Sequence, residues 1–167
     1  KGQYIITAVT FELTNVDHKL KTAYGAITSE LKQMGVLAPT IQDVSKAVIA
    51  IRQSKFPDPK KLGNSGSFFK NPVVSKESFE TLLKQFPNMP KYAVSETEVK
   101  IPAGWLIETA GFKGKTFGNY GVHKHQALVL VNYGGASGRD ILALSKLIQT
   151  TIRTIFGIEL ETEVNVR

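Results

Sequence analysis

At residues 55–72 the chain reads KFPDPKKLGNSGSFFKNP, and the other predicted elements are arranged around this stretch. It is rich in turn-forming residues. Proline fixes its own backbone angles and glycine adopts angles that other residues avoid, so the composition predicts a shaped loop and not a flexible one. The loop carries four lysines, and the hydroxyl of Ser67 lies between Gly66 and Phe68. A hydroxyl in these surroundings suits an anionic ligand that receives a proton.

The residues before this loop predict one strand and two helices. Residues 4–13 (YIITAVTFEL) are rich in β-branched and aromatic side chains, which favours a strand. Residues 26–34 predict a short helix. Thr40 begins a longer helix, with Asp43 three residues later in a weakened capping box, and Pro57 ends it. Helical spacing predicts one buried face on this helix, formed by Ile41, Val44, Val48 and Ile51.

The residues after the loop mix short strands with helices. Ser75 is positioned to cap a helix with a single apolar stripe, made of Phe79, Leu82, Leu83 and Phe86. Residues 99–101 predict a short strand, residues 103–110 a short helix, and residues 127–132 a buried strand.

The C-terminal third predicts the longest helix and a final strand. The helix spans residues 139–156, and its core-facing side chains are Ile141, Leu144, Ile148, Ile152 and Ile155. Residues 158–166 alternate between apolar and polar side chains, as in a strand with one buried face. Because the strands and helices do not alternate regularly, we expect an α+β fold.

Composition narrows the function classes. The chain has 167 residues, 42% of them hydrophobic and 21% charged, a balance typical of a globular domain. Its net charge of +7 favours anionic partners, such as nucleic acid, an acidic membrane surface or a phosphorylated metabolite. The absence of cysteine excludes disulfides and thiolate sites. No apolar run approaches the roughly 18 residues of a membrane span, so we expect no membrane partner.

Five segments share motifs with one known family. They read TAYGAI at 22–27, GSFFKNP at 66–72 after the run 55–60, AGWLIETAGFKG at 103–114, GVHKHQALVLVN at 121–132 and LETEV at 160–164. In this order they resemble the UDP-N-acetylenolpyruvoylglucosamine reductase family. The resemblance implies a cytoplasmic flavoenzyme of peptidoglycan synthesis. With FAD as cofactor and NADPH as co-substrate, such an enzyme reduces UDP-N-acetylglucosamine enolpyruvate to UDP-N-acetylmuramate.

The resemblance also implies a domain organisation. Family members carry a flavin-binding region before these motifs, and no flavin or dinucleotide signature precedes Tyr4 here. The chain therefore looks like a C-terminal portion. Residues 1–56 would end the flavin-binding domain, residues 57–157 would form a mixed-sheet substrate-binding domain, and residues 158–167 would be a strand returning to the flavin side. Alone, the chain is expected to lack tightly bound FAD and to be inactive, and its exposed strands favour a dimer.

Two residues match the family's catalytic positions. Ser67 resembles the serine that acts as general acid, and Glu163 resembles the acid that supports the enol intermediate. Each residue type has an ordinary alternative. A serine in a glycine-rich turn commonly hydrogen-bonds its own backbone, and a glutamate on a strand's polar face is commonly just solvated. The family motif, and not spacing alone, selects these two residues.

Five further residues match binding positions. The substrate-binding candidates are Tyr24, Lys55, Asn71 and Gln126, and the cofactor-binding candidate is Arg52. Lys55 and Tyr24 would hold the diphosphate side, and the two amides would contact the uridine and phosphate portions. The ordinary alternatives are a loop tyrosine, a surface lysine, a helix-capping asparagine and a glutamine at the edge of the core.

Other interpretations of the sequence compete with this one. His123 and His125 are two residues apart, but no third ligand at a familiar spacing follows, so no metal site is predicted. A basic α+β module binding nucleic acid would explain the charge and the Phe68-Phe69-Lys70 loop, although the basic residues are scattered and we expect no nucleic-acid partner. A reductase remnant kept as an interaction domain is a third interpretation.

Overall fold

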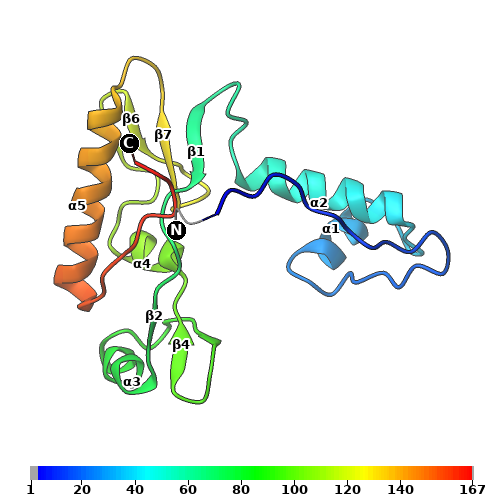
Figure 1. The fold of residues 1–167 in the computed structure, drawn as a ribbon, viewed down its shortest axis with the longest axis horizontal. Coiled ribbons are helices and arrows are strands. Elements are labelled where there is room, and N and C mark those ends of the chain that lie inside the picture. The colour runs from blue at the N-terminus through cyan, green and yellow to red at the C-terminus, as the bar shows by residue number, and fades with distance from the viewer. Residues whose placement is uncertain (1–3, 167) are drawn as a thin grey trace. The chain divides into compact units, whose positions relative to one another are not determined.

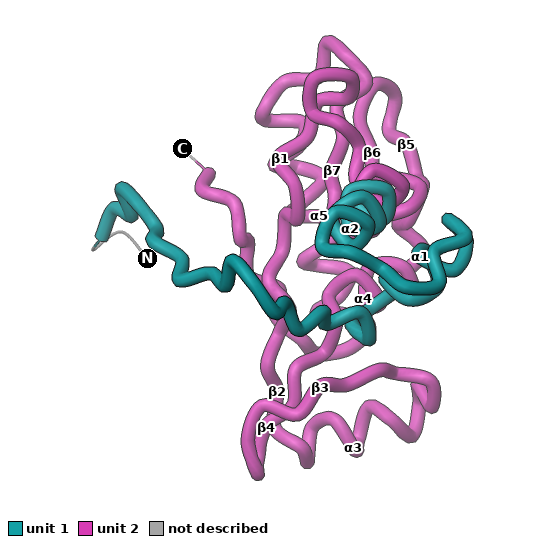
Figure 2. The backbone as a smooth tube through the Cα atoms, turned by 90° about the vertical axis from the view of Figure 1, so that its right-hand side faces the viewer, with its two compact units in different colours: residues 1–52 teal, residues 53–167 magenta. Residues whose placement is uncertain are grey.

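The computed structural model describes residues 4–166, and the chain divides into two compact units (Figure 2). The first unit comprises residues 1–52 and the second comprises residues 53–167. None of the helices among the described residues is long and apolar enough to cross a membrane.

The first unit is built on two helices, α1 (Ile27–Gln33) and α2 (Ile41–Lys55). The last three residues of α2 belong to the second unit. The predicted capping box is confirmed. The Thr40 N–H donates to Asp43 Oδ2 at 2.9 Å, and the Asp43 N–H donates to Thr40 Oγ1 at 3.3 Å. The small core consists of Ile27, Leu31 and Ala47, with Val36, Val44, Val48 and Ile51 packed against it. Ile41, expected on the buried face, is exposed because it lies in the first turn of α2, away from this core.

Residues 4–13 were predicted as a strand, and this prediction is wrong for the described chain. They form no β-ladder, and their apolar side chains are exposed; Ile5, for example, is 91% accessible. A strand requires a hydrogen-bonding partner as well as β propensity, and within residues 4–166 no segment pairs with this one.

The second unit contains two sheets. The four-stranded sheet has the order β1-β7-β6-β5, and its strands are β1 (Gly63–Ser67), β7 (Val129–Asn132), β6 (Tyr120–Val122) and β5 (Thr116–Phe117). The three-stranded sheet has the order β2-β4-β3, with β2 (Val73–Ser75), β4 (Glu98–Lys100) and β3 (Tyr92–Ala93). The α+β class is confirmed. The sheets, expected to be mixed, are antiparallel in every ladder of the described residues.

Three helices cover these sheets (Figure 1). The helix α5 (Gly138–Phe156) packs on β6 and β7 and contacts α4 (Ala103–Thr109), whereas α3 (Lys76–Gln85) packs on β2 and β4. The predicted Ser75 cap is confirmed, since its hydroxyl accepts the Ser78 N–H. One continuous core joins both sheets to the helices. On α5 the expected core residue Ile155 is 40% exposed, and the next residue, Phe156, is buried instead.

The C-terminal tail, residues 158–166, keeps the predicted alternation at its start but forms no regular strand, and Val166, expected on the buried face, is 52% exposed. Ile158 and Leu160 are buried while Glu159 and Glu161 are exposed. The tail makes a single bridge, between Thr162 and Phe69, among the described residues. In Figure 1 it runs (red) from the end of α5 back toward the four-stranded sheet. Its partner is therefore the segment that follows β1 in the same chain.

Candidate functional site

The centre of the candidate site is the end of β1, where the strand is irregular. The stretch expected to be a loop contains β1, which pairs with β7. Asn64 is opposite Val131 and Ser67 is opposite Val129, so β1 advances three residues while β7 advances two. The extra residue is a β-bulge, and Gly66 within it has a φ of +72°, which is strained for any residue with a side chain.

The side chain of Asn64 holds this bulge through three hydrogen bonds. Its Nδ2 donates to the carbonyl oxygens of Pro57 at 3.2 Å and Leu62 at 2.8 Å. Its Oδ1 accepts the Gly66 N–H at 3.0 Å. Asn64 was not identified from the sequence. An Asn-x-Gly pattern in a turn could have indicated the bond to Gly66, because asparagine oxygens often accept the amide two residues later.

Ser67 is half-buried, and its neighbours anchor it on the C-terminal side. Phe68 and Phe69 are both buried, with ring centroids 5.2 Å apart. The Phe68 N–H donates to the Leu128 carbonyl at 2.8 Å. Among the described residues no hydrogen bond engages the Ser67 hydroxyl, so the bond to its own backbone that is common for turn serines is not made here.

The tail brings Glu163 next to this segment. The Glu163 N–H donates to the Phe68 carbonyl at 2.8 Å, and the Lys70 N–H donates to the Glu161 carbonyl at 2.9 Å. The Lys70 ammonium also pairs with the Glu161 carboxylate. Ser67 and Glu163 thus lie on adjacent hydrogen-bonded segments, although they are remote from each other in the sequence.

Asn71 and Gln126 both lie near the start of α4. Pro102, at the N-cap position of α4, provides no side-chain cap, and Asn71 supplies one: its Oδ1 accepts the Ala103 N–H at 2.8 Å. Gln126 Oε1 accepts the Leu128 N–H at 3.3 Å and lies 3.6 Å from where a Cβ on Gly104 would be. The helix-capping alternative for Asn71 is therefore correct as a description of its oxygen. Both amides keep their NH₂ groups available as donors.

The remaining predicted ligands are exposed and are divided between the units. Tyr24 and Arg52 belong to the first unit, and Tyr24 is 83% exposed in the turn before α1. Lys55 is the exposed last residue of α2. Each presents a cation or a phenol to solvent.

The two neighbouring histidines differ in environment. His123 is buried, at 9% exposure, and its Nδ1 accepts the His125 N–H at 3.4 Å. Burial lowers the pKa of His123, and the nearby His125 and Lys124 charges lower it further. His123 is therefore a neutral core residue near pH 7. Across residues 4–166, no cluster of three or more His, Asp or Glu could hold a metal ion.

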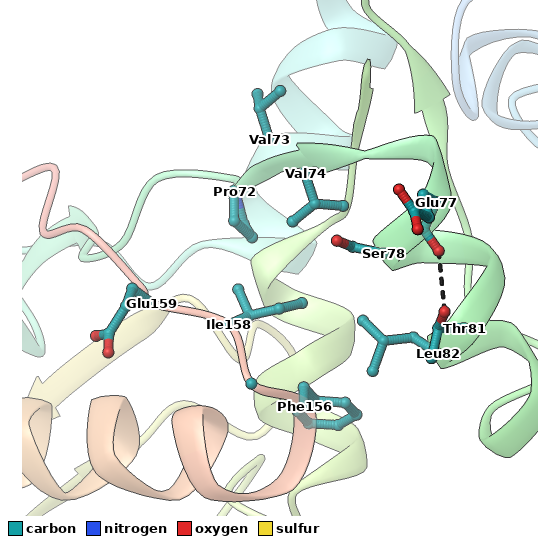
Figure 3. A pocket seen from close by; sticks show the side chains of 11 residues that line it. Pro72, Val73, Val74, Glu77, Ser78, Thr81, Leu82, Phe156, Ile158 and Glu159 are labelled. Carbon is teal, nitrogen blue, oxygen red and sulfur yellow. Dashed lines mark hydrogen bonds between the residues drawn. The ribbon is translucent and has the colours of Figure 1, made fainter. Parts of the chain in front are cut away.

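Two cavities are lined entirely by residues of the second unit. One, of 740 Å³, adjoins the serine segment: Ser65 and Phe68 line it together with Arg139 of α5 and residues 164–166 of the tail. The other, of 630 Å³, lies between β2, α3 and the residues that follow α5 (Figure 3). Neither lining includes a predicted site residue, because the first cavity is lined by Ser65 and Phe68 but not by Ser67 or Glu163.

Comparison with known proteins identifies relatives of the chain. The family model described as UDP-N-acetylenolpyruvoylglucosamine reductase, C-terminal domain, matches residues 58–167. The chain is 63% identical over 166 residues to the UDP-N-acetylenolpyruvoylglucosamine reductase of Flavobacterium johnsoniae, covering 99% of the chain and 49% of that protein. Proteins of the same name from Chromobacterium violaceum and Bacteroides fragilis are 51% identical over 162 residues and 48% over 161. Those matches cover 97% and 96% of this chain and 47% of each relative. The chain thus spans about half the length of the curated relatives it matches.

Proposed function

The chain belongs to the UDP-N-acetylenolpyruvoylglucosamine reductase family, and we propose that it is the substrate-binding part of such a reductase. In the proposed reaction the enolpyruvyl ether of a UDP-sugar is reduced to UDP-N-acetylmuramate in the cytoplasm, for peptidoglycan synthesis. The single observation that carries the proposal is the arrangement at the bulge, where Ser67 is half-buried and the Glu163 N–H donates to the carbonyl of the next residue, Phe68.

Reduction of the enolpyruvyl double bond adds a hydride to its terminal carbon and a proton to the carbon beside the carboxylate. NADPH is the source of the electrons, and the flavin supplies the hydride when it is bound. Ser67 donates the proton, because a neutral hydroxyl can be aimed at the carbon where negative charge develops. Glu163 stabilises the enol intermediate or helps to protonate it.

The two amides at the start of α4 serve as donors to the UDP portion. The oxygen of Asn71 is used by the Ala103 N–H and the oxygen of Gln126 by the Leu128 N–H. Their NH₂ groups therefore face partners that accept hydrogen bonds, which uracil carbonyls and phosphate oxygens do. Lys55 and Tyr24 contribute a charge and a phenolic hydroxyl to the diphosphate.

The flavin is assigned mainly to another part of a longer protein. In this chain we assign only Arg52 to it. One exposed guanidinium suits a phosphate or an anionic ring but does not enclose a flavin. The chain alone is therefore expected to be inactive. We do not retain the nucleic-acid-binding alternative, since an anionic UDP-sugar accounts for the basic charge and the family relationship gives that alternative no support.

The test is Ser67→Ala in a full-length reductase that contains this chain. We expect NADPH to reduce the flavin at the normal rate, while reduction of the UDP-sugar falls about 10²- to 10⁴-fold, the usual contribution of a general acid. Ser65→Ala is the matched control, because Ser65 lies on the same strand, is exposed and should retain full activity. A Ser67→Ala enzyme that reduces the UDP-sugar at a normal rate would show that another group is the acid.

A further inference from the structure

We propose that Asn64 is a positioning residue for Ser67: its carboxamide fixes the bulge that sets the direction of the serine hydroxyl. The proposal rests on the function proposed above, in which Ser67 is the proton donor. Asn64 itself need not touch the substrate.

The bulge decides which face of the sheet Ser67 occupies. Side chains alternate between faces along a strand, and residues directly opposed in an antiparallel pair share a face. Val129 and Val131 are two residues apart and share a face, so their partners Ser67 and Asn64 share it as well. In a regular strand, residues 64 and 67 would lie on opposite faces, because three residues separate them. Without the extra residue, the Ser67 hydroxyl would point to the other side of the sheet.

The Asn64 side chain hydrogen-bonds the chain both before and within the bulge. Its NH₂ group gathers the carbonyls of Pro57 and Leu62 from the incoming loop, and its oxygen holds the N–H of Gly66 immediately before Ser67. A Cβ on Gly66 would meet nothing within 4 Å, so glycine is required there by its φ of +72° and not by crowding. Asn64 therefore hydrogen-bonds Gly66, the residue of the bulge that has the left-handed backbone conformation.

Loss of these bonds frees the bulge to shift along β1 or to straighten. Either change moves the hydroxyl relative to a substrate that other residues hold. A displacement of about 1 Å in a reacting group can lower a rate about 100-fold. Substrate affinity should be little changed, since the hydrogen-bond partners of the Asn64 side chain are Pro57, Leu62 and Gly66, and none of them is assigned to UDP binding.

The experiment compares Asn64→Ala with Asn132→Ala in the full-length reductase. Asn132 is a matched control: it is half-buried, its carboxamide also makes three hydrogen bonds, and these hold residues 134–136 instead of the bulge. We expect Asn64→Ala to lower kcat for the UDP-sugar about 100-fold, with KM and flavin reduction by NADPH unchanged. Asn132→Ala should lose similar stability but retain kcat.

Two further readouts separate positioning from a general loss of stability. In the Ser67→Ala background, Asn64→Ala should cause no additional loss of kcat, because both changes remove the same proton transfer. In this chain, amide hydrogen exchange at Gly66 should accelerate in Asn64→Ala and remain normal in Asn132→Ala. Should Asn64→Ala fail to fold, Asn64→Asp is used, which keeps the acceptor for Gly66 but loses both donors and should lower kcat about 10-fold.

The outcomes distinguish the positioning role of Asn64 from the role of Ser67 as proton donor. An Asn64→Ala enzyme with normal kcat, or a further loss of kcat when it is combined with Ser67→Ala, overturns the positioning role. A fully active Ser67→Ala enzyme instead overturns the assignment of the acid. Low kcat in Ser67→Ala together with normal kcat in Asn64→Ala leaves Ser67 as the acid and removes Asn64 alone.

Discussion

Asn71 is assigned two tasks, and substitution can separate them. Its oxygen caps α4 through the 2.8 Å bond from Ala103, and its NH₂ group is proposed to bind the UDP portion of the substrate. Asn71→Ala removes both functions. Asn71→Asp keeps an oxygen for the cap but replaces the donors with a second oxygen and a negative charge.

The structure gives opposite rankings for stability and for binding. Loss of a side-chain cap lowers the free energy of unfolding by about 1 kcal/mol, so we expect that loss for Asn71→Ala. Asn71→Asp should be as stable as the native chain, or up to about 0.5 kcal/mol more stable, because a carboxylate is favoured at a helix N-terminus. For the UDP-sugar, losing one hydrogen bond to a charged group weakens Kd about 10-fold in Asn71→Ala. Repulsion between the introduced carboxylate and the diphosphate should bring the loss to about 100-fold in Asn71→Asp.

Stability is measured by urea unfolding of this chain. Its single tryptophan, Trp105, lies on α4 and reports directly on the capped helix, with its ring centroid 6.1 Å from that of Phe156. Affinity is measured by calorimetric titration of the full-length protein with the UDP-sugar. If Asn71→Asp is as unstable as Asn71→Ala, the capping argument is wrong. If Asn71→Asp binds the UDP-sugar like the native protein, Asn71 is not a ligand.

Three further predictions concern the histidine, a glycine and the N-terminal segment. Burial lowers the pKa of His123 in the folded chain, so below the ordinary histidine pKa of 6.5 the unfolded chain binds more protons. The free energy of unfolding should therefore fall as pH drops through that value. Urea midpoints measured between about pH 8 and about pH 5 should lose this pH dependence in His123→Gln but keep it in His18→Gln. Gly121→Ala should lower stability by about 3 kcal/mol, because its Cβ would lie 2.9 Å from a backbone carbon of β5, whereas Gly138→Ala has open space and should be neutral in the same unfolding assay. The exposed apolar residues of 4–13 favour self-association, so light scattering should detect a dimer that two lysine substitutions in this segment convert to monomer, and a monomer at all concentrations of the native chain would contradict the prediction.

The helix N-terminal caps could be predicted reliably from the sequence. The Thr40–Asp43 box and the Ser75 cap each depend on residues three apart, and both are present in the structure. An identical box forms where α5 begins, with Ser137 and Asp140 bonded in both directions, and the same S-x-x-D spacing would have predicted it. Such patterns are readable because all of their atoms lie within one helical turn.

Features that depend on distant partners were not predicted. Residues 55–72 read as a loop because five of them are glycine or proline, yet Gly63 pairs with Asn132, far along the chain, and part of the stretch becomes a strand. Residues 4–13 have strand propensity but no partner among the described residues. Tertiary pairing, which local composition does not contain, decides both cases.

In the candidate site, too, the sequence indicated individual residues but not how distant segments bring them together. Motif resemblance named Ser67, Glu163, Asn71 and Gln126 one by one, but each was only a residue type with a common structural alternative. Their arrangement arises from the bulge in β1, the pairing of the tail with residues 68–70 and the cap on α4. These features connect positions that are remote in sequence, so only the folded chain reveals that the oxygen of Asn71 is already occupied.

The pairing between the tail and the serine segment also sets an order of events during protein synthesis. Lys70 and Glu161 are 91 residues apart, so a ribosome adding about 5–20 residues per second needs about 5 to 18 s between them. By the end of that interval the residues of β1, the start of α4 and β7 have all been synthesised, whereas until then the carbonyl of Phe68 has no tail amide to accept. The Glu163 N–H therefore pairs with the Phe68 carbonyl only after the residues of the scaffold that holds Ser67 have been synthesised. The segments that carry the proposed acid and its carboxylate partner are thus the last parts of the site that can come together during synthesis.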